Sequence, residues 1–172
     1  MDAGLVYAER STAILAEETA GELHDRLALL GPDAIDEVLQ QHAAGTLLGK
    51  AQDESQVTVA RKLSKAGARV DFTLSATQVK ATINGLTPWP GVQATLVMAD
   101  GMRFQLLLRR AGLASSAASG GGAGDLAPDG TVVCGEGAIA LLEVQKPGGK
   151  VMPFEAFARG VKLTSGDRLV VE

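Results

Sequence analysis

The side chains best suited to chemistry are two histidines and one cysteine, and they lie far apart in the sequence. His24 lies beside Asp25, His42 lies near the expected end of a helix, and Cys134 lies in an expected strand. A metal site needs several ligands at close spacing, and a catalytic His or Cys needs an orienting partner and a pocket. We therefore predict no metal site and no catalytic residue, with both histidines in solvent and Cys134 as a buried, inert thiol.

A glycine-rich run over residues 120–124 could be mistaken for a phosphate-binding loop. Such a loop follows a strand, ends in Gly-Lys-Ser or Gly-Lys-Thr and begins a helix, and none of these surrounds residues 120–124. All of residues 114–124 are Ala, Ser or Gly. This composition is typical of a spacer, and we predict a flexible insert over residues 114–128.

Basic side chains in the last two thirds of the chain could contact phosphates. Each Lys or Arg placed near a phosphate releases counterions, so a dispersed basic face binds RNA without reading its bases. Such binding would depend on shape and charge. The alternative is a solvated surface without a partner. The candidate RNA-binding residues are Lys62, Lys65, Arg103, Arg109, Arg110, Lys146, Lys150, Arg159, Lys162 and Arg168.

Composition excludes several classes of protein. The chain has 172 residues, of which 46% are apolar, enough to bury a core. Aromatic residues make up only 3%, so a base-stacking platform is not expected, and one cysteine cannot build a disulfide framework. No apolar run is long enough to span a membrane. Acidic residues among the first eighteen argue against a secretory signal or transit peptide.

Charge is distributed unevenly along the chain. Residues 1–60 hold three Lys or Arg against eleven Asp or Glu, whereas residues 61–172 hold thirteen against nine. Only the second region would attract a polyanion. The acidic first region would suit a protein partner, or its helices simply have solvated acidic faces.

Two short amphipathic helices are predicted over residues 19–44. Thr19 and Glu22 have the spacing of a capping box at the start of the first helix. Gly31 ends that helix, and Pro32 suits the first position of the second. Both helices carry an apolar stripe, so both need a surface to lie on.

Residues 47–70 show little periodicity and are predicted to be a linker. Ser75 then begins a third helix with Val79, Ile83 and Leu86 turned inward, and the prolines after it end that helix. We expect Trp89, between two prolines, to plug the core between helix and barrel.

From residue 92 the pattern is typical of strands. Two hairpins, a single helical turn ended by Gly160 and a last strand predict an α+β chain whose C-terminal part is a small OB-like barrel with one or two helices. The strands are predicted over residues 92–98, 102–109, 131–134, 138–145 and 169–171.

Several strings of residues occur in the order found in one family. They are residues 19–27 (Thr-Ala-Gly-Glu-Leu-His-Asp-Arg-Leu), 62–65 (Lys-Leu-Ser-Lys), 88–91 (Pro-Trp-Pro-Gly), 132–138 (Val-Val-Cys-Gly-Glu-Gly-Ala), 141–145 (Leu-Leu-Glu-Val-Gln) and 166–169 (Gly-Asp-Arg-Leu). Together they resemble the methionyl-tRNA formyltransferases. The resemblance implies that residues 1–46 are a remnant of a Rossmann-like catalytic domain, 47–70 a linker and 71–172 the C-terminal OB-like domain.

That resemblance implies a function in translation initiation. The whole enzyme would transfer a formyl group from 10-formyltetrahydrofolate to initiator Met-tRNA, and this chain would hold the tRNA-binding barrel. It binds no cofactor itself on this interpretation, and neither DNA nor a membrane is an expected partner.

The departures from the family concern catalysis. The family's folate-binding Ser-Leu-Leu-Pro segment and its catalytic Asn and His have no counterpart here. Residues 1–5 match the start of the family's Met-Asp-x-Gly-Leu-Asp-Thr-Gly stretch, but the catalytic Asp after it is missing, and Asp2 matches the earlier Asp. We therefore expect the chain alone to be inactive. The insert at 114–124 replaces a usual barrel strand, so we expect an open sheet edge.

Two interpretations remain open. The chain is the C-terminal part of a methionyl-tRNA formyltransferase, or it is a non-catalytic RNA-binding or assembly protein derived from that family, with a protein covering the helices at 19–44. A related enzyme that shares the barrel, such as a sugar-nucleotide formyltransferase, is a weaker third. The compartment would be the cytoplasm in a bacterium, or a mitochondrion or plastid in a eukaryote.

Overall fold

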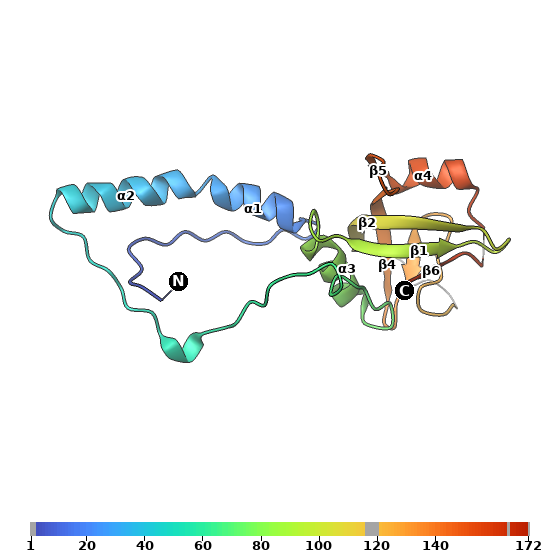
Figure 1. Ribbon diagram of the computed structural model, residues 1–172, viewed down its shortest axis with the longest axis horizontal. Helices are drawn as coiled ribbons and strands as arrows, with labels where there is room; N and C mark the ends of the chain where they lie inside the picture. The colour runs from blue at the N-terminus through green and yellow to red at the C-terminus, as the bar shows by residue number, and fades with distance from the viewer. Residues whose placement is uncertain (1–2, 116–120, 165, 172) are drawn as a thin grey trace. The chain divides into compact units, whose positions relative to one another are not determined.

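The computed structural model describes residues 3–115, 121–164 and 166–171 and divides them into two compact units. Unit 1 holds the described residues up to Leu15 together with Glu22–Lys62. Unit 2 holds Ala16–Gly21 together with the described residues from Leu63 onward. The division after Lys62 falls within the predicted linker, and the elements of both units are labelled in Figure 1.

Unit 1 contains the helices predicted over residues 19–44. They are α1 (Ala20–Ala28), whose first two residues belong to unit 2, and α2 (Gly31–Ala43), which has a proline in its first turn as expected. A single 3-10 turn, η1 (Glu54–Gln56), follows. Neither α1 nor α2 buries a residue, so their apolar stripes have no core of their own.

The N-terminal stretch is tied to these helices by polar contacts. Arg10 donates to the Glu37 carboxylate at 2.6 Å, and Arg26 donates to the Thr12 hydroxyl at 3.1 Å. These bonds involve exposed or half-exposed groups, which contribute little to stability in water. Unit 1 is therefore held mainly by surface contacts.

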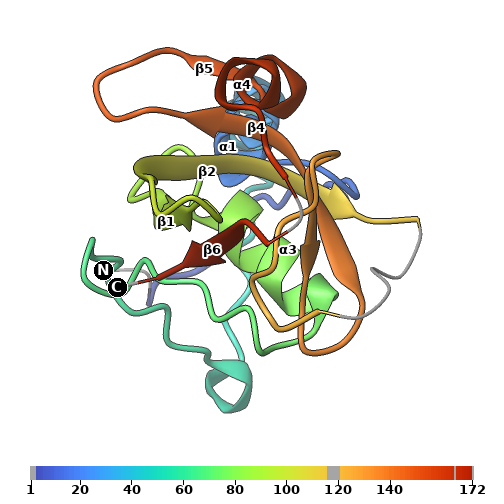
Figure 2. The same ribbon diagram turned by 90° about the vertical axis from the view of Figure 1, so that its right-hand side faces the viewer.

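Unit 2 is built around one antiparallel sheet. Its strand order is β3-β4-β2-β1-β6, with β5 pairing β4 off this path. The tight turn predicted at Asp100 and Gly101 joins β1 to β2, with Gly101 at φ +89°. In Figure 2, β4 and β2 lie between the two helices α4 and α3. The strands are β1 (Val92–Val97), β2 (Arg103–Leu113), β3 (Thr131–Val133), β4 (Ala138–Gln145), β5 (Val151–Pro153) and β6 (Arg168–Val170).

The open edge that we expected is closed by residues 124–127. Gly124 accepts a hydrogen bond from the backbone of Leu169 on β6 at 2.7 Å and donates to Val133 on β3 at 2.9 Å. Asp125 and Leu126 form isolated bridges to the same two strands. The glycine-rich sequence concealed this segment, because backbone bonds close the barrel and need no strand-like side chains. Residues 116–120 of the predicted insert lie outside the described residues.

Helix α3 (Ala76–Gly85) seals the core of the barrel. Ser75 and Gln78 form a full capping box at its start, as the Ser75 prediction required. Val79 and Ile83 are buried against the inward-facing residues of the sheet, including Leu106 and Leu108. The predicted inward face of this helix is confirmed.

Strand β2 runs to Leu113, four residues beyond its predicted end. Its pairing with β4 shifts register around Arg110, which marks a bulge. Buried Asn84 of α3 spans this point: its amide nitrogen donates to the Ala111 carbonyl at 3.0 Å, and its oxygen accepts from the Ala111 nitrogen at 2.9 Å. Two arginines in succession concealed the strand from sequence analysis, since the bulge breaks strict alternation.

Two further details differ from the predictions. The single turn expected near residue 154 is a helix, α4 (Phe154–Val161), which continues through Gly160 and ends at Lys162 in the left-handed conformation. Strand β5 was not predicted, because three residues are too few to show alternation. Phe154 and Phe157 of α4 are buried in the core.

The prediction that Trp89 plugs the core is wrong. Its side chain is 55% exposed, and Val79 and Ile83 fill that role instead. Hydrogen bonds from two other side chains hold the turn that carries Trp89: the Arg109 guanidinium donates to the Pro88 carbonyl at 3.1 Å, and the Thr87 hydroxyl donates to the Ile83 carbonyl at 3.0 Å. The indole therefore faces outward.

Candidate nucleic-acid interface

The outer surface of three neighbouring strands brings two of the predicted basic residues into one row. Val97 of β1 pairs with Arg103 of β2 on one side and with Arg168 of β6 on the other. Residues directly opposite in an antiparallel sheet point to the same face. Both arginines are exposed, and two strand spacings of roughly 5 Å separate their backbones.

The neighbouring rows continue this surface with polar and apolar side chains. Gln105 donates to the Thr95 hydroxyl at 2.8 Å in the second row. Within the described residues of these rows, no outward position carries a carboxylate. We call this surface the basic face; its residues are Gln93, Thr95, Val97, Arg103, Gln105, Leu107, Arg168 and Val170.

Arg109 and Arg110 sit at the β2 bulge, where their guanidinium groups make contacts within unit 2. Arg109 donates to the Pro88 carbonyl at 3.1 Å. Arg110 donates to the Glu17 carbonyl at 2.9 Å and forms a 3.5 Å ion pair with Glu143. Both side chains therefore hold other segments of unit 2 in place, a role that sequence analysis did not predict.

Four predicted residues lie near α4. The Lys146 ammonium stands 5.5 Å from the centre of the Phe157 ring, and Lys150 is exposed in the loop before β5. Arg159 and Lys162 line a cavity of about 420 Å³ together with Asp129 and Glu155. The acidic neighbours reduce the positive potential at that cavity, so it would attract an anion less strongly than the basic face would.

The two remaining predicted residues precede the barrel. Lys65 lies in a turn in which the Gly67 nitrogen donates to the Ser64 carbonyl at 3.2 Å. Lys62 belongs to unit 1 and Lys65 to unit 2. Both are exposed.

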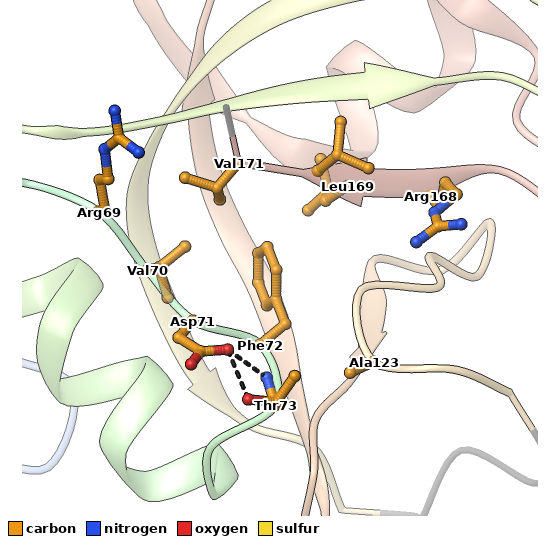
Figure 3. Close-up of a pocket in the computed structure, with 10 residues that line it drawn as sticks. Arg69, Val70, Asp71, Phe72, Thr73, Ala123, Arg168, Leu169 and Val171 are labelled. Atoms are coloured by element: carbon orange, nitrogen blue, oxygen red, sulfur yellow. Dashed lines mark hydrogen bonds between the residues drawn. The ribbon is translucent and has the colours of Figure 1, made fainter.

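Arg69, which is not among the ten predicted RNA-binding residues, lies beside the basic face. Arg69 and Arg168 both line a cavity of about 460 Å³ between the segment 69–73 and β6 (Figure 3). The signal for Arg69 was the alternation of apolar and charged residues after it, and the apolar Val70 and Phe72 of that pattern are both buried. Buried and exposed side chains alternate along residues 68–73, so this segment packs on the barrel core.

Two titratable groups of unit 2 have shifted pKa values. Hydrogen bonds from the Thr73 hydroxyl and backbone nitrogen hold the pKa of the Asp71 carboxyl below its usual range. Burial raises the pKa of the Cys134 thiol, which confirms the predicted buried cysteine. Asp71 therefore stays ionised at neutral pH, and Cys134 stays protonated.

Two searches of the described residues bear on other kinds of site. Across residues 3–115, 121–164 and 166–171, no three His, Cys, Asp or Glu side chains gather closely enough to hold a metal ion. Among the helices of that same part of the chain, none is long and apolar enough to cross a bilayer.

Comparison with known sequences gives one consistent match. Residues 62–162 match the family model of the formyl transferase C-terminal domain. The chain is 40% identical over 176 residues to a methionyl-tRNA formyltransferase of Ectopseudomonas mendocina, covering 95% of this chain and 53% of that protein. It is 38% identical to the enzyme of the same name from Solibacter usitatus, covering 98% of this chain and 53% of that protein. The chain thus spans about half the length of these relatives.

Comparison with solved structures supports the fold. HypX from Aquifex aeolicus matches with a TM-score of 0.64 and 19% identity, over 93% of this chain and 29% of HypX. A second structure of HypX, in complex with tetrahydrofolic acid, matches with a TM-score of 0.63. At this identity the likeness concerns the fold alone.

Proposed function

The chain belongs to the formyl transferase family, whose C-terminal domain it contains, and we propose that its barrel holds initiator Met-tRNA for a methionyl-tRNA formyltransferase. The reaction would transfer a formyl group from 10-formyltetrahydrofolate to the amino group of Met-tRNA during translation initiation. The resemblance of the sequence and the names of the relatives support this assignment.

The observation that carries the proposal is the row formed by Arg168, Val97 and Arg103. Two exposed guanidinium groups face the same way from the strands on either side of β1, without a carboxylate at the described outward position between them. Guanidinium groups bind phosphates through paired hydrogen bonds. The basic face would thus hold two phosphates of a folded RNA and leave the bases unread.

The other basic residues have secondary parts in this proposal. Lys62, Lys65 and Lys150 are exposed and would add long-range attraction. Arg109 and Arg110 would act through the turn and the segment that they hold in place.

The chain would contribute tRNA binding and no catalytic group. We propose that folate binding and formyl transfer belong to parts of the family enzyme that have no counterpart in this sequence. The relatives compared above are bacterial, which supports a bacterial, cytoplasmic setting over an organelle.

The experiment measures binding of fluorescently labelled initiator Met-tRNA to the 172-residue chain by anisotropy. The double variant Arg103→Ala/Arg168→Ala should weaken binding at least about tenfold, because each guanidinium makes a charge-assisted contact. Lys50→Ala/Arg61→Ala removes the same charge outside the basic face and should change binding far less. Equal losses in the two double variants would refute the role of this face.

A parallel assay tests the absence of catalysis. With 10-formyltetrahydrofolate and Met-tRNA present, we expect the chain to produce no formylated product. Turnover above a no-protein control would show that this chain contains an active site.

A second candidate function is a non-catalytic RNA-binding or assembly role, with a protein partner on the helices. Apolar side chains that are 60% exposed at Ile35 and 59% at Leu39 favour it. A complex that forms only through these residues, in a chain that binds tRNA but supports no formylation, would support this candidate.

A further inference from the structure

The cavity between residues 69–73 and β6 has the form of a small ligand site. Its volume of about 460 Å³ falls in the range that holds a small molecule. Apolar side chains of Val70, Phe72, Leu169 and Val171 line it. The rim is polar: Figure 3 shows the Asp71 carboxylate on one side of Phe72 and the Arg168 guanidinium on the other.

Two arginines at this rim, Arg69 and Arg168, could each donate hydrogen bonds to a ligand. Neither Arg168 nor Arg69 forms an ion pair or side-chain hydrogen bond with another described residue. Arg168 also belongs to the basic face, so one side chain borders both the cavity and the face. In Figure 3 the Arg69 guanidinium points away from Phe72, so Arg69 would act mainly through its charge.

The Asp71 carboxylate at this rim could accept a hydrogen bond from a ligand. Asp71 Oδ1 accepts from the Thr73 nitrogen at 2.9 Å and from the Thr73 hydroxyl at 2.6 Å. These bonds fix the carboxylate, while Oδ2 has no partner among the described residues. A fixed carboxylate oxygen accepts a hydrogen bond from an amino group of a base, as Asp and Glu do with cytosine N4.

A flat apolar body with an anion at one end and an N–H donor at the other fits this arrangement. We propose that the cavity binds one unpaired nucleotide of an RNA, with its phosphate at Arg168, its base over the apolar lining and an exocyclic amino group at Asp71. That the nucleotide comes from an RNA rests on the proposed RNA-binding function, whereas the fit of a nucleotide to the cavity does not. Adenine, guanine and cytosine carry the required amino group, and uracil does not.

Cytidine and uridine 5′-monophosphates test the chemistry, because they differ only at one edge of the base. We expect the 172-residue chain to bind the cytidine nucleotide about tenfold more tightly than the uridine nucleotide, measured by calorimetry at low salt. Arg168→Ala should weaken both about tenfold, and Arg61→Ala, which removes a charge from unit 1, should weaken neither. Equal affinity for the two nucleotides, or no measurable binding of either, would overturn the proposal.

Asp71→Asn gives a sharper test without removing the bond to Thr73. The asparagine oxygen still accepts from Thr73, while the amide nitrogen now donates to the base. The preference should therefore reverse toward the uridine nucleotide, whose O4 is an acceptor. An unchanged preference in a variant with unchanged thermal unfolding would contradict the assigned role of Asp71.

A competition experiment with short RNAs distinguishes this proposal from the proposed function. A short RNA with unpaired cytidines should displace the cytidine nucleotide from the wild-type chain, and the same RNA with uridines should displace it less. Nucleotide binding without such displacement would overturn the RNA source. Loss of tRNA binding in Arg103→Ala with nucleotide binding retained would show that the basic face and the cavity act separately.

Discussion

At the scale of single residues, the shape of the barrel depends on a few buried polar groups. Asn84 satisfies both backbone groups of Ala111 where β2 bulges. Asp167, fully buried, accepts from the Ala99 nitrogen and the Thr164 nitrogen, each at 2.8 Å. Buried polar groups are costly unless paired, so these residues specify one arrangement of the strands around them.

Asn84→Ala should destabilise unit 2 by about 2–4 kcal/mol, because it leaves a buried N–H and a buried carbonyl without partners. The measurement is urea unfolding followed by circular dichroism. Gln93→Ala is the matched control, since it removes an exposed amide from β1 and should cost no more than about 0.5 kcal/mol. Similar losses for the two variants would contradict the role assigned to Asn84.

Cys134 should react slowly with a thiol reagent at pH 8 in the folded chain and rapidly in urea. Burial shields the thiol and raises its pKa above the ordinary 9.0. The contribution of this group to stability is present below the ordinary pKa and is lost as pH rises toward the raised one. Cys134→Ala should remove that alkaline loss, and rapid reaction of the native thiol would refute the assignment.

At the scale of elements, local signals located most of the barrel, but long-range pairing did not show in the sequence. Alternation located β1 and β4, and Ser75 marked the start of α3. The segment 124–127 was missed, because it joins two strands through backbone bonds and shows no alternation of apolar and polar side chains. The bulge in β2 depends on Asn84 from another element, so no window of local sequence contains it.

Gly124→Ala tests whether this closing segment matters for stability. A Cβ at Gly124 would lie 2.5 Å from the Leu169 carbonyl oxygen, and the residue has φ +92°. We expect a loss of about 2–5 kcal/mol from the combined clash and backbone strain. Gly101→Ala shares the positive φ but meets nothing within 4 Å, so its loss should stay near about 1–2 kcal/mol.

Equal effects of the two glycine substitutions would show that the backbone conformation alone accounts for the loss. In that case the contact between residues 124 and 169 would contribute nothing measurable to barrel closure. Thermal unfolding of the two variants side by side provides this comparison.

At the scale of the whole molecule, charge and fold together support the proposed RNA-binding surface. Sequence analysis predicted a basic C-terminal region with ten candidate residues, and it could place them only by the strand, loop or turn that holds each one. Sheet register brings Arg103 and Arg168 into one row, while Arg110 makes internal contacts and Lys62 belongs to unit 1. This grouping could not be predicted, because it depends on the pairing of β1 with β6, in which Arg168 lies opposite Val97, 71 residues earlier in the sequence.

The most direct test of the account is the salt dependence of initiator Met-tRNA binding to the basic face. The logarithm of the binding constant should fall linearly with the logarithm of salt concentration, by roughly 0.7–0.9 per phosphate contacted. Arg103→Ala/Arg168→Ala should reduce the slope by about 1–2, and Lys50→Ala/Arg61→Ala should leave it nearly unchanged. A slope that is the same in the wild-type chain and the first variant would contradict phosphate contact by this face.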